Sequence, residues 1–203
     1  MIQDGNQRMK LGVTGGIGSG KTSVCRVFNV LGIPVFSADP EAQKIMNSDE
    51  EIRKGINKIA GRDLYEGGNL DRGKLASLIF SNPDILAKVN ELVHPAVFAY
   101  FEKWTNEQTA PYSIMEAAIL FESGASKLVD RVVTVVAPLE ERILRVIKGK
   151  KLSRKQIMER ISNQMDDESR MKLSDYVINN SENDMIIPAI LKIHEDILNH
   201  LNA

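Results

Sequence analysis

Short apolar runs separated by turn residues recur along the chain. They are mostly rich in β-branched residues and lie at Leu11 to Val13, Ile33 to Phe36, Ser113 to Met115, Val132 to Val136 and Tyr176 to Ile178. Short, continuously apolar runs are typical of strands that are buried on both faces, as in a parallel sheet. The pattern therefore predicts a five-stranded parallel sheet.

Helical patterns lie between these runs. Residues 22–31 predict a helix that Gly32 ends, because glycine readily adopts the left-handed conformation past a helix C-terminus. Another helix is expected from about Pro83 towards Trp104, with a kink or break at Pro95. Strands that alternate with helices imply right-handed crossovers. The fold class expected is α/β, a three-layer α/β/α sandwich.

The stretch between the second and third expected strands is unusually long. Residues 40–111 are mostly helical in pattern, with a turn-rich patch at residues 64–69, which predicts an inserted subdomain. Residues 1–8 are polar and lack the apolar stretch of a secretory signal, so a flexible extension is expected ahead of a single domain at 9–203. The core of that domain would comprise residues 9–39, 112–140 and 171–203.

Composition narrows the classes of protein to consider. Of the 203 residues, 43% are hydrophobic and 26% charged, as in globular proteins rather than disordered chains. Lys and Arg number 26 against 27 acidic residues, and a net charge of −1 gives no general footprint for nucleic acid. Cys25 is the only cysteine, which excludes an internal disulfide and suits the cytoplasm. The longest apolar run, residues 114–121, is too short to cross a membrane.

A phosphate-binding motif follows the first expected strand and opens the first helix. It matches G-x-x-x-x-G-K-[ST] and consists of Gly15, Gly16, Ile17, Gly18, Ser19, Gly20, Lys21 and Thr22. In this setting backbone N–H groups and the helix N-terminus surround phosphates. Lys21 would bridge the β- and γ-phosphates of ATP, and the Thr22 hydroxyl would bind Mg²⁺.

Many protein classes share such a loop, so other residues must separate them. The N-K-x-D and D-x-x-G motifs of regulatory GTPases do not occur. The third expected strand ends at Glu116, a single carboxylate where ATPases that activate water usually have an acidic pair. A kinase is therefore favoured over a switch or an ATPase.

Asp39 stands at the end of the second expected strand. Ligands of open α/β sheets lie beyond the carboxyl ends of the strands, so Asp39 could orient an acceptor hydroxyl and contact Mg²⁺. An alternative interpretation is structural, because Asp39, Pro40 and Glu41 also resemble a helix start with an aspartate N-cap.

A basic segment without acidic residues spans residues 142–155. Its basic members are Arg142, Arg145, Lys148, Lys150, Lys151, Arg154 and Lys155. The first three recur at three-residue spacing and would share a helix face. A lid that carries them could neutralise the triphosphate and exclude water, whereas the alternative is a solvated basic surface.

The order of these features resembles the dephospho-CoA kinase family over nearly all of residues 9–203. Beyond the phosphate loop the resemblance is carried by the segments Gly32 to Val35 with Ala38 and Asp39, Leu70 to Arg72, Ile79 and Phe80, Leu92 to Pro95, Ile119 to Glu122, and Asp175 to Asn180. It implies transfer of the ATP γ-phosphate to the ribose 3′-hydroxyl of dephospho-CoA, giving coenzyme A and ADP. It also implies Mg²⁺ as cofactor, no nucleic acid or membrane partner, and a monomer or small homo-oligomer.

The resemblance further implies roles for single residues. Asp39 would activate the acceptor hydroxyl, residues 40–111 would bind the CoA substrate, and residues 141–170 would form the lid. Arg145 would assist catalysis, Arg142 and Asn179 would contact ATP, and the acceptor would meet His94, Leu120 and Glu122. One departure is Gly149, where such kinases usually have a second lid arginine. From the residues alone, His94 could instead orient the helix break at Pro95, and Glu122 could be a solvated loop acid.

Two other functions remain open at this point. One is a phosphate-loop kinase with a different small-molecule or nucleotide acceptor, and the other is a phosphate-loop regulatory protein whose insertion binds a partner. A nucleic-acid kinase or ATPase is disfavoured by the neutral net charge and by the lack of an aromatic stacking platform.

Overall fold

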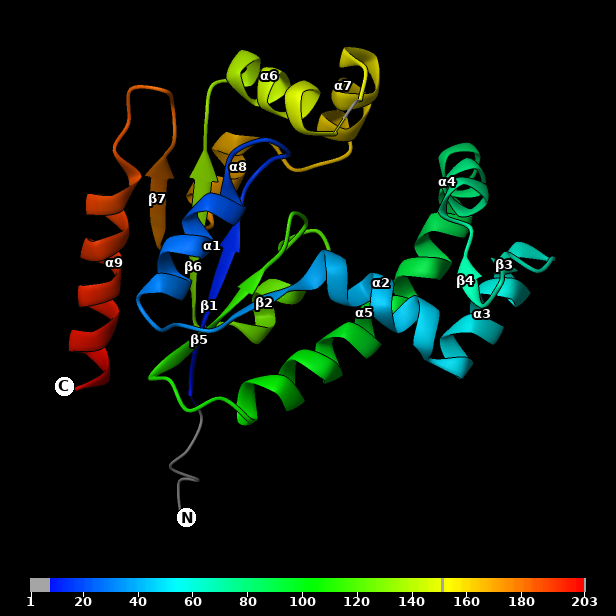
Figure 1. Ribbon diagram of the computed structural model, residues 1–203, viewed down its shortest axis with the longest axis horizontal. Coiled ribbons are helices and arrows are strands. Elements are labelled where there is room, and N and C mark those ends of the chain that lie inside the picture. The colour runs from blue at the N-terminus through cyan, green and yellow to red at the C-terminus, as the bar shows by residue number, and fades with distance from the viewer. Residues whose placement is uncertain (1–7, 151, 203) are drawn as a thin grey trace. The chain divides into compact units, whose positions relative to one another are not determined.

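The computed structural model describes residues 8–150 and 152–202, so residues 1–7 of the predicted extension lie outside the described residues (Figure 1). Its main sheet contains five parallel strands in the order β2-β5-β1-β6-β7. They are β1 (Met9–Thr14), β2 (Val35–Ser37), β5 (Tyr112–Glu116), β6 (Arg131–Val136) and β7 (Tyr176–Asn179). The predicted sheet is therefore confirmed, and each strand lies where an apolar run predicted it.

Alternate residues of the strands point to opposite faces of this sheet. On one face Leu11, Ile114 and Val133 join a core with α1 (Lys21–Val30) and α9 (Ile186–Leu201). On the other face the sheet carries buried hydroxyl pairs, such as Thr105 with Ser113 at 3.2 Å. α8 (Asp167–Lys172) contacts β6. The chain thus adopts the three-layer α/β/α fold that the alternation predicts.

Helix α1 begins immediately after the phosphate loop and ends as the sequence predicts. Leu31 caps its C-terminus, and Gly32 follows with φ 83°, a left-handed conformation that favours glycine. The inner side of α1 buries Val24, Cys25 and Phe28. Burial raises the pKa of the Cys25 thiol far above its usual range, so this cysteine is a packed core group.

Three helices follow β6 and include most of the basic segment. They are α6 (Leu139–Lys150), α7 (Arg154–Ser162) and α8, and a 3₁₀ helix η1 (Ala125–Leu128) precedes β6. Ile143 and Val146 of α6 pack with Ile157 of α7, and Ile17 of the phosphate loop packs against them. Hydrophobic burial therefore fixes this segment against the loop.

The chain divides into two compact units, Met1–Ser37 with Thr105–Ala203, and Ala38–Trp104. The second unit, called here the insertion unit, lies within the predicted insertion at 40–111 apart from its first two residues. It contains α2 (Ala38–Ser48), α3 (Glu50–Ala60), a hairpin of β3 (Tyr65–Glu66) and β4 (Asn69–Leu70), α4 (Arg72–Ser81) and most of α5 (Pro83–Asn106). Gly67 and Gly68 form the hairpin turn with φ 56° and 84°, which is the pattern of a two-residue type I′ turn.

A kink or break was expected at Pro95, and helix α5 continues through this residue without a break. Proline lacks the N–H that would bond the carbonyl four residues earlier. A stripe of buried residues at four-residue spacing, Val89, Val93, Val97 and Phe101, passes across the proline. Packing along this stripe holds both halves in one helix.

Helix α2 starts two residues earlier than the helix-cap interpretation expects. Ala38 is its first residue, so Asp39 lies inside the first turn rather than at the N-cap. Carboxylates cap other helices of the same unit, since Asp49 accepts from the Ile52 N–H at 3.0 Å and Asp71 from the Lys74 N–H at 2.9 Å. Within the described residues no helix has the length and apolar character needed to cross a bilayer.

Candidate active site

The phosphate loop joins β1 to α1 in an open, curled conformation. Gly18 and Gly20 have φ values of 78° and 98°, which favour glycine. A Cβ at Gly18 would lie 2.5 Å from the Arg142 carbonyl oxygen, and one at Gly20 would lie 2.0 Å from Asn180 Nδ2. Both glycines are therefore required by conformation and by close neighbours.

Lys21 folds back along the loop. Its Nζ donates to the Gly15 carbonyl at 2.9 Å and lies 3.5 Å from that of Gly16. The ammonium thus stands over the first residues of the loop. Ser19 Oγ is also buried here and has no hydrogen-bond partner among the described residues. A buried, unpaired hydroxyl inside a loop rich in N–H donors suits an anionic ligand.

A carboxylate that was not among the expected site residues lies beside the loop. Glu116, the last residue of β5, accepts from Thr22 Oγ1 at 3.0 Å and from Ser37 Oγ at 2.9 Å. The hydroxyl and carboxylate oxygens form a set of hard ligands that fits Mg²⁺. The position of Glu116 at the carboxyl end of a strand beside the loop was the pattern that could have identified it.

Arg142 lies against the phosphate loop and is only 5% exposed. Its Nε donates to the Ile17 carbonyl at 2.9 Å, and its Nη1 donates to Asp167 at 2.7 Å. Burial lowers the pKa of Arg142, while the neighbouring Asp167 raises it. The solvated-surface interpretation is therefore wrong for Arg142, which is built into the wall of the loop.

Arg145 stands one helical turn further along α6. Its Nη2 donates to Glu141 at 2.9 Å, and Glu141 also accepts from the Glu182 N–H at 3.0 Å. Its Nη1 is buried and has no partner in the described part of the chain. Lys148 is exposed, and among the described residues a Cβ at Gly149 would meet no atom within 4 Å. Along the expected common face of α6, Arg142 is therefore buried, Arg145 is partly buried and Lys148 is exposed.

Asn180 contacts the loop, whereas the predicted residue Asn179 has an exposed side chain. The Asn180 Nδ2 donates to the Ser19 carbonyl at 2.7 Å. The two asparagines are adjacent in the sequence, and side chains of neighbouring residues in an extended segment point to opposite sides. The sequence alone does not show which of the two asparagines contacts the loop, and the folded structure does.

A cluster of polar residues, the Gln164 cluster, holds the segment between α7 and α8 against the loop. Its members are Glu122, Gln164, Asp167 and Arg170. Gln164 Oε1 accepts from the Ile17 N–H at 3.0 Å, and Asp167 accepts from Arg170 at 2.7 Å as well as from Arg142. Arg170 is fully buried. Except for Glu122, these residues were not expected in the site, because the contacts that link Gln164 and Asp167 to the loop and its arginine join distant parts of the chain.

The residues expected on the acceptor side have different surroundings. Glu122 is an exposed residue that accepts from the Met165 N–H at 2.8 Å, so this acid bonds the segment before α8. Leu120 is fully buried, and a Cβ at Gly12 of β1 would lie 2.7 Å from it, so its side chain contributes packing. His94 lies on α5 in the insertion unit, stacked on Phe98 with ring centroids 6.0 Å apart. Partial burial lowers the pKa of His94.

Asp39 belongs to the insertion unit, where it is exposed in the first turn of α2. One residue, Ala38, separates it from Ser37, which bonds Glu116 beside the loop. Asp39 is thus two residues along the chain from a member of the group that contains Thr22 and Glu116.

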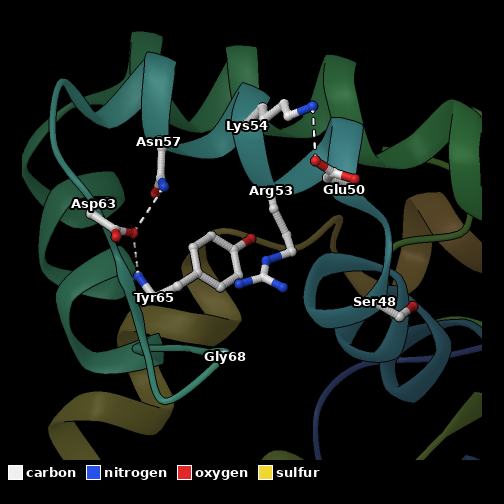
Figure 2. Close-up of a pocket in the computed structure, with 8 residues that line it drawn as sticks. All are labelled: Ser48, Glu50, Arg53, Lys54, Asn57, Asp63, Tyr65 and Gly68. Carbon is white, nitrogen blue, oxygen red and sulfur yellow. Dashed lines mark hydrogen bonds and ion pairs between the residues drawn. The ribbon is translucent and has the colours of Figure 1, made fainter.

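The insertion unit contains a polar cavity of about 630 Å³ beyond the C-terminal end of α2 (Figure 2). Figure 2 shows the Arg53 guanidinium beside the ring of Tyr65, and its centre lies 4.6 Å from the ring centroid. The wall is fixed by Asp63, which accepts from Asn57 and from the Tyr65 N–H at 2.9 Å each. Among the described residues no carboxylate pairs with Arg53. Its guanidinium N–H groups at the cavity can therefore donate to a ligand.

Together the parallel sheet, the glycine loop at the start of α1 and the lysine over that loop define a phosphate-loop nucleotide-binding protein of the α/β/α class. The sequence comparisons make this class more specific. Residues 9–185 match the family model described as dephospho-CoA kinase, and the chain belongs to that family.

Individual relatives agree with the family match. A dephospho-CoA kinase of Bacteroides fragilis is 39% identical over 186 residues, which is 91% of each chain. The crystal structure of TT1252 from Thermus thermophilus superimposes with a TM-score of 0.83 at 31% identity, covering 97% of this chain and 99% of the other. The dephospho-CoA kinase structure from Campylobacter jejuni gives 0.67 at 26% identity, covering 93% and 96%.

Proposed function

We propose that the protein transfers the γ-phosphate of ATP to the ribose 3′-hydroxyl of dephospho-CoA, which yields coenzyme A and ADP. The observation that carries this function is the phosphate loop, with Lys21 over its first carbonyls and the Thr22 to Glu116 contact at its end, in a chain of the dephospho-CoA kinase family. The unpaired Ser19 hydroxyl supports a phosphate in the loop.

The transfer assigns distinct tasks to the site residues. The 3′-oxygen attacks the γ-phosphorus, the bond from that phosphorus to the bridging oxygen of the β-phosphate breaks, and the hydroxyl proton passes to the Asp39 carboxylate. Lys21 and the loop N–H groups stabilise the charge on the phosphates, and the unpaired Nη1 of Arg145 would add a further donor.

Mg²⁺ fits the residues at the end of the loop. Thr22 and Asp39 would hold the ion, and Glu116 would orient Thr22 through the hydrogen bond between them. When bound, the ion neutralises phosphate charge during the transfer. The proposed place of the reaction is the cytoplasm.

The insertion unit would bind the acceptor. Its cavity offers the Arg53 guanidinium, whose planar N–H donors suit phosphate or amide oxygens. Asp39 and the cavity lie near opposite ends of α2, and a helix rises about 1.5 Å per residue. An elongated acceptor such as dephospho-CoA can span that length with its ribose at Asp39 and its pantetheine arm towards Arg53.

An acceptor-dependence experiment tests the function. Purified protein with Mg²⁺ and ATP should release ADP only when dephospho-CoA is added, and the product should comigrate with coenzyme A. Coenzyme A itself, which already has the 3′-phosphate, serves as the matched non-acceptor. Equal ADP release with and without dephospho-CoA would reject the function.

A further inference from the structure

We infer that Gln164 is a further catalytic residue whose carboxamide N–H groups contact the γ-phosphoryl group of ATP. This role rests on the proposed function, because it requires a phosphoryl group above the loop. Gln164 lies between α7 and α8, is half-buried, and reaches the loop across a long separation in the sequence.

The contact of Gln164 places it next to the lysine that binds the phosphates. Its Oε1 accepts from the Ile17 N–H at 3.0 Å, and the carbonyl of the same peptide group, that of Gly16, lies 3.5 Å from Lys21 Nζ. A single peptide group therefore separates the Gln164 carboxamide from the Lys21 ammonium. A terminal phosphate bound by Lys21 would lie at this edge of the loop.

The orientation of the carboxamide follows from chemistry. The Ile17 N–H can only donate, so the oxygen of Gln164 must face it and the amino group must face away. In the described part of the chain no residue accepts a hydrogen bond from Gln164 Nε2. Two N–H donors of a residue at the loop are thus left for a ligand.

The backbone beside Gln164 is fixed on both of its polar groups. The Met165 N–H donates to Glu122 at 2.8 Å, and the Met165 carbonyl accepts from Arg170 Nη2 at 2.6 Å. Arg170 is fully buried and also donates to Asp167 at 2.7 Å. Such support holds a donor in place before charge develops, which is the condition under which a hydrogen bond lowers a barrier.

Two of the three donor nitrogens of the nearby arginine are already in use. Nε and Nη1 of Arg142 bond the Ile17 carbonyl and Asp167. In phosphoryl transfer the charge spreads over the equatorial oxygens of the transferred group, so an additional donor at the loop edge stabilises the transition state. Gln164 supplies that donor.

Two substitutions separate catalysis from support of the loop. Gln164→Glu keeps an oxygen that accepts from the Ile17 N–H but replaces the donors with a negative charge. We expect kcat to fall about 100-fold, with an unchanged melting temperature and an unchanged KM for dephospho-CoA. Gln164→Met, which removes both functions, should also lower kcat. Gln156→Glu, at the capping box of α7, is the matched control and should keep wild-type kcat.

Nucleotide binding gives a readout that does not depend on the acceptor. Gln164→Glu should bind the non-hydrolysable β,γ-imido analogue of ATP about tenfold more weakly, while its affinity for ADP stays that of the wild type. Equal affinities of wild type and Gln164→Glu for the analogue, or equal losses for analogue and ADP, would overturn the role of Gln164. Wild-type protein that binds the analogue but does not phosphorylate dephospho-CoA would reject the proposed function instead.

Discussion

Two arginines show how differently the two units of this chain use a guanidinium group. Arg142 is 5% exposed at the phosphate loop and bonds both a backbone carbonyl and Asp167. Arg53 of the insertion unit is half-exposed, stacks on Tyr65, and has no carboxylate partner among the described residues. Arg142 is bonded to other groups of the protein, whereas the guanidinium of Arg53 can bind a ligand.

The difference indicates which arginine supports the structure of the site and which one binds the acceptor. A buried guanidinium needs its partners, because an unpaired buried charge is costly. Its loss should affect stability together with activity. A half-exposed guanidinium remains hydrated without a partner, so its loss should affect only the binding of the acceptor.

Asp39→Asn is expected to have the largest effect on turnover. The amide cannot take the hydroxyl proton, so kcat should fall about 10²- to 10³-fold, while the affinity for ATP and the melting temperature stay close to wild type. Steady-state kinetics and thermal unfolding measure both. Asp49→Asn, at the true N-cap of α3, is the control and should keep its turnover. A loss of stability without loss of turnover in Asp39→Asn would restore the structural interpretation of this residue.

Arg142→Met should lower stability and activity together. The substitution leaves Asp167 with Arg170 alone and the Ile17 carbonyl without its donor. We expect a loss of about 3 kcal/mol, which corresponds to roughly 6–12 °C in melting temperature. Arg154→Met removes an exposed arginine that pairs with Glu140 and should cost far less. Similar melting temperatures for the two variants would show that the bonds of Arg142 do not stabilise the folded protein.

Arg53→Met should raise the KM for dephospho-CoA about tenfold and leave the KM for ATP unchanged. The methionine keeps packing against Tyr65 but loses every N–H donor. Arg62→Met, an exposed position of the same unit, is the matched control. An adenosine acceptor without the pantetheine arm should not distinguish Arg53→Met from wild type. If it does, the cavity does not bind that arm.

The smallest expected effect is a pH dependence of stability from His94. Burial lowers its pKa in the folded protein, so the unfolded chain binds the proton more readily. Its stabilising contribution is complete above the unfolded pKa, about 6.5, and is lost as the pH falls through the lower folded value. The melting temperature of the wild type should fall between pH 7 and 5. In His94→Gln this fall should be smaller by about 1–2 °C. His200→Gln, an exposed control on α9, should leave the decline unchanged.

Local patterns in the sequence predicted the sheet, the loop and the end of α1, because these depend on neighbouring residues. The continuity of α5 through Pro95 could not be predicted in this way, since buried contacts along the helix outweigh the missing hydrogen bond. Gln164, Asp167 and Asn180 were missed for a related reason. Each contacts the loop or its arginine from a distant part of the chain, and only the folded structure brings them together.

The burial of Cys25 on the inner side of α1 has a practical consequence. The sole thiol of the chain is 3% exposed, and a thiol reagent reacts with the thiolate, which burial disfavours here. Cysteines introduced on the surface, for example at Arg62 and Lys172, would therefore take spectroscopic labels selectively. Distances between such labels could then follow the two units while nucleotide and acceptor are added, without first removing a native cysteine.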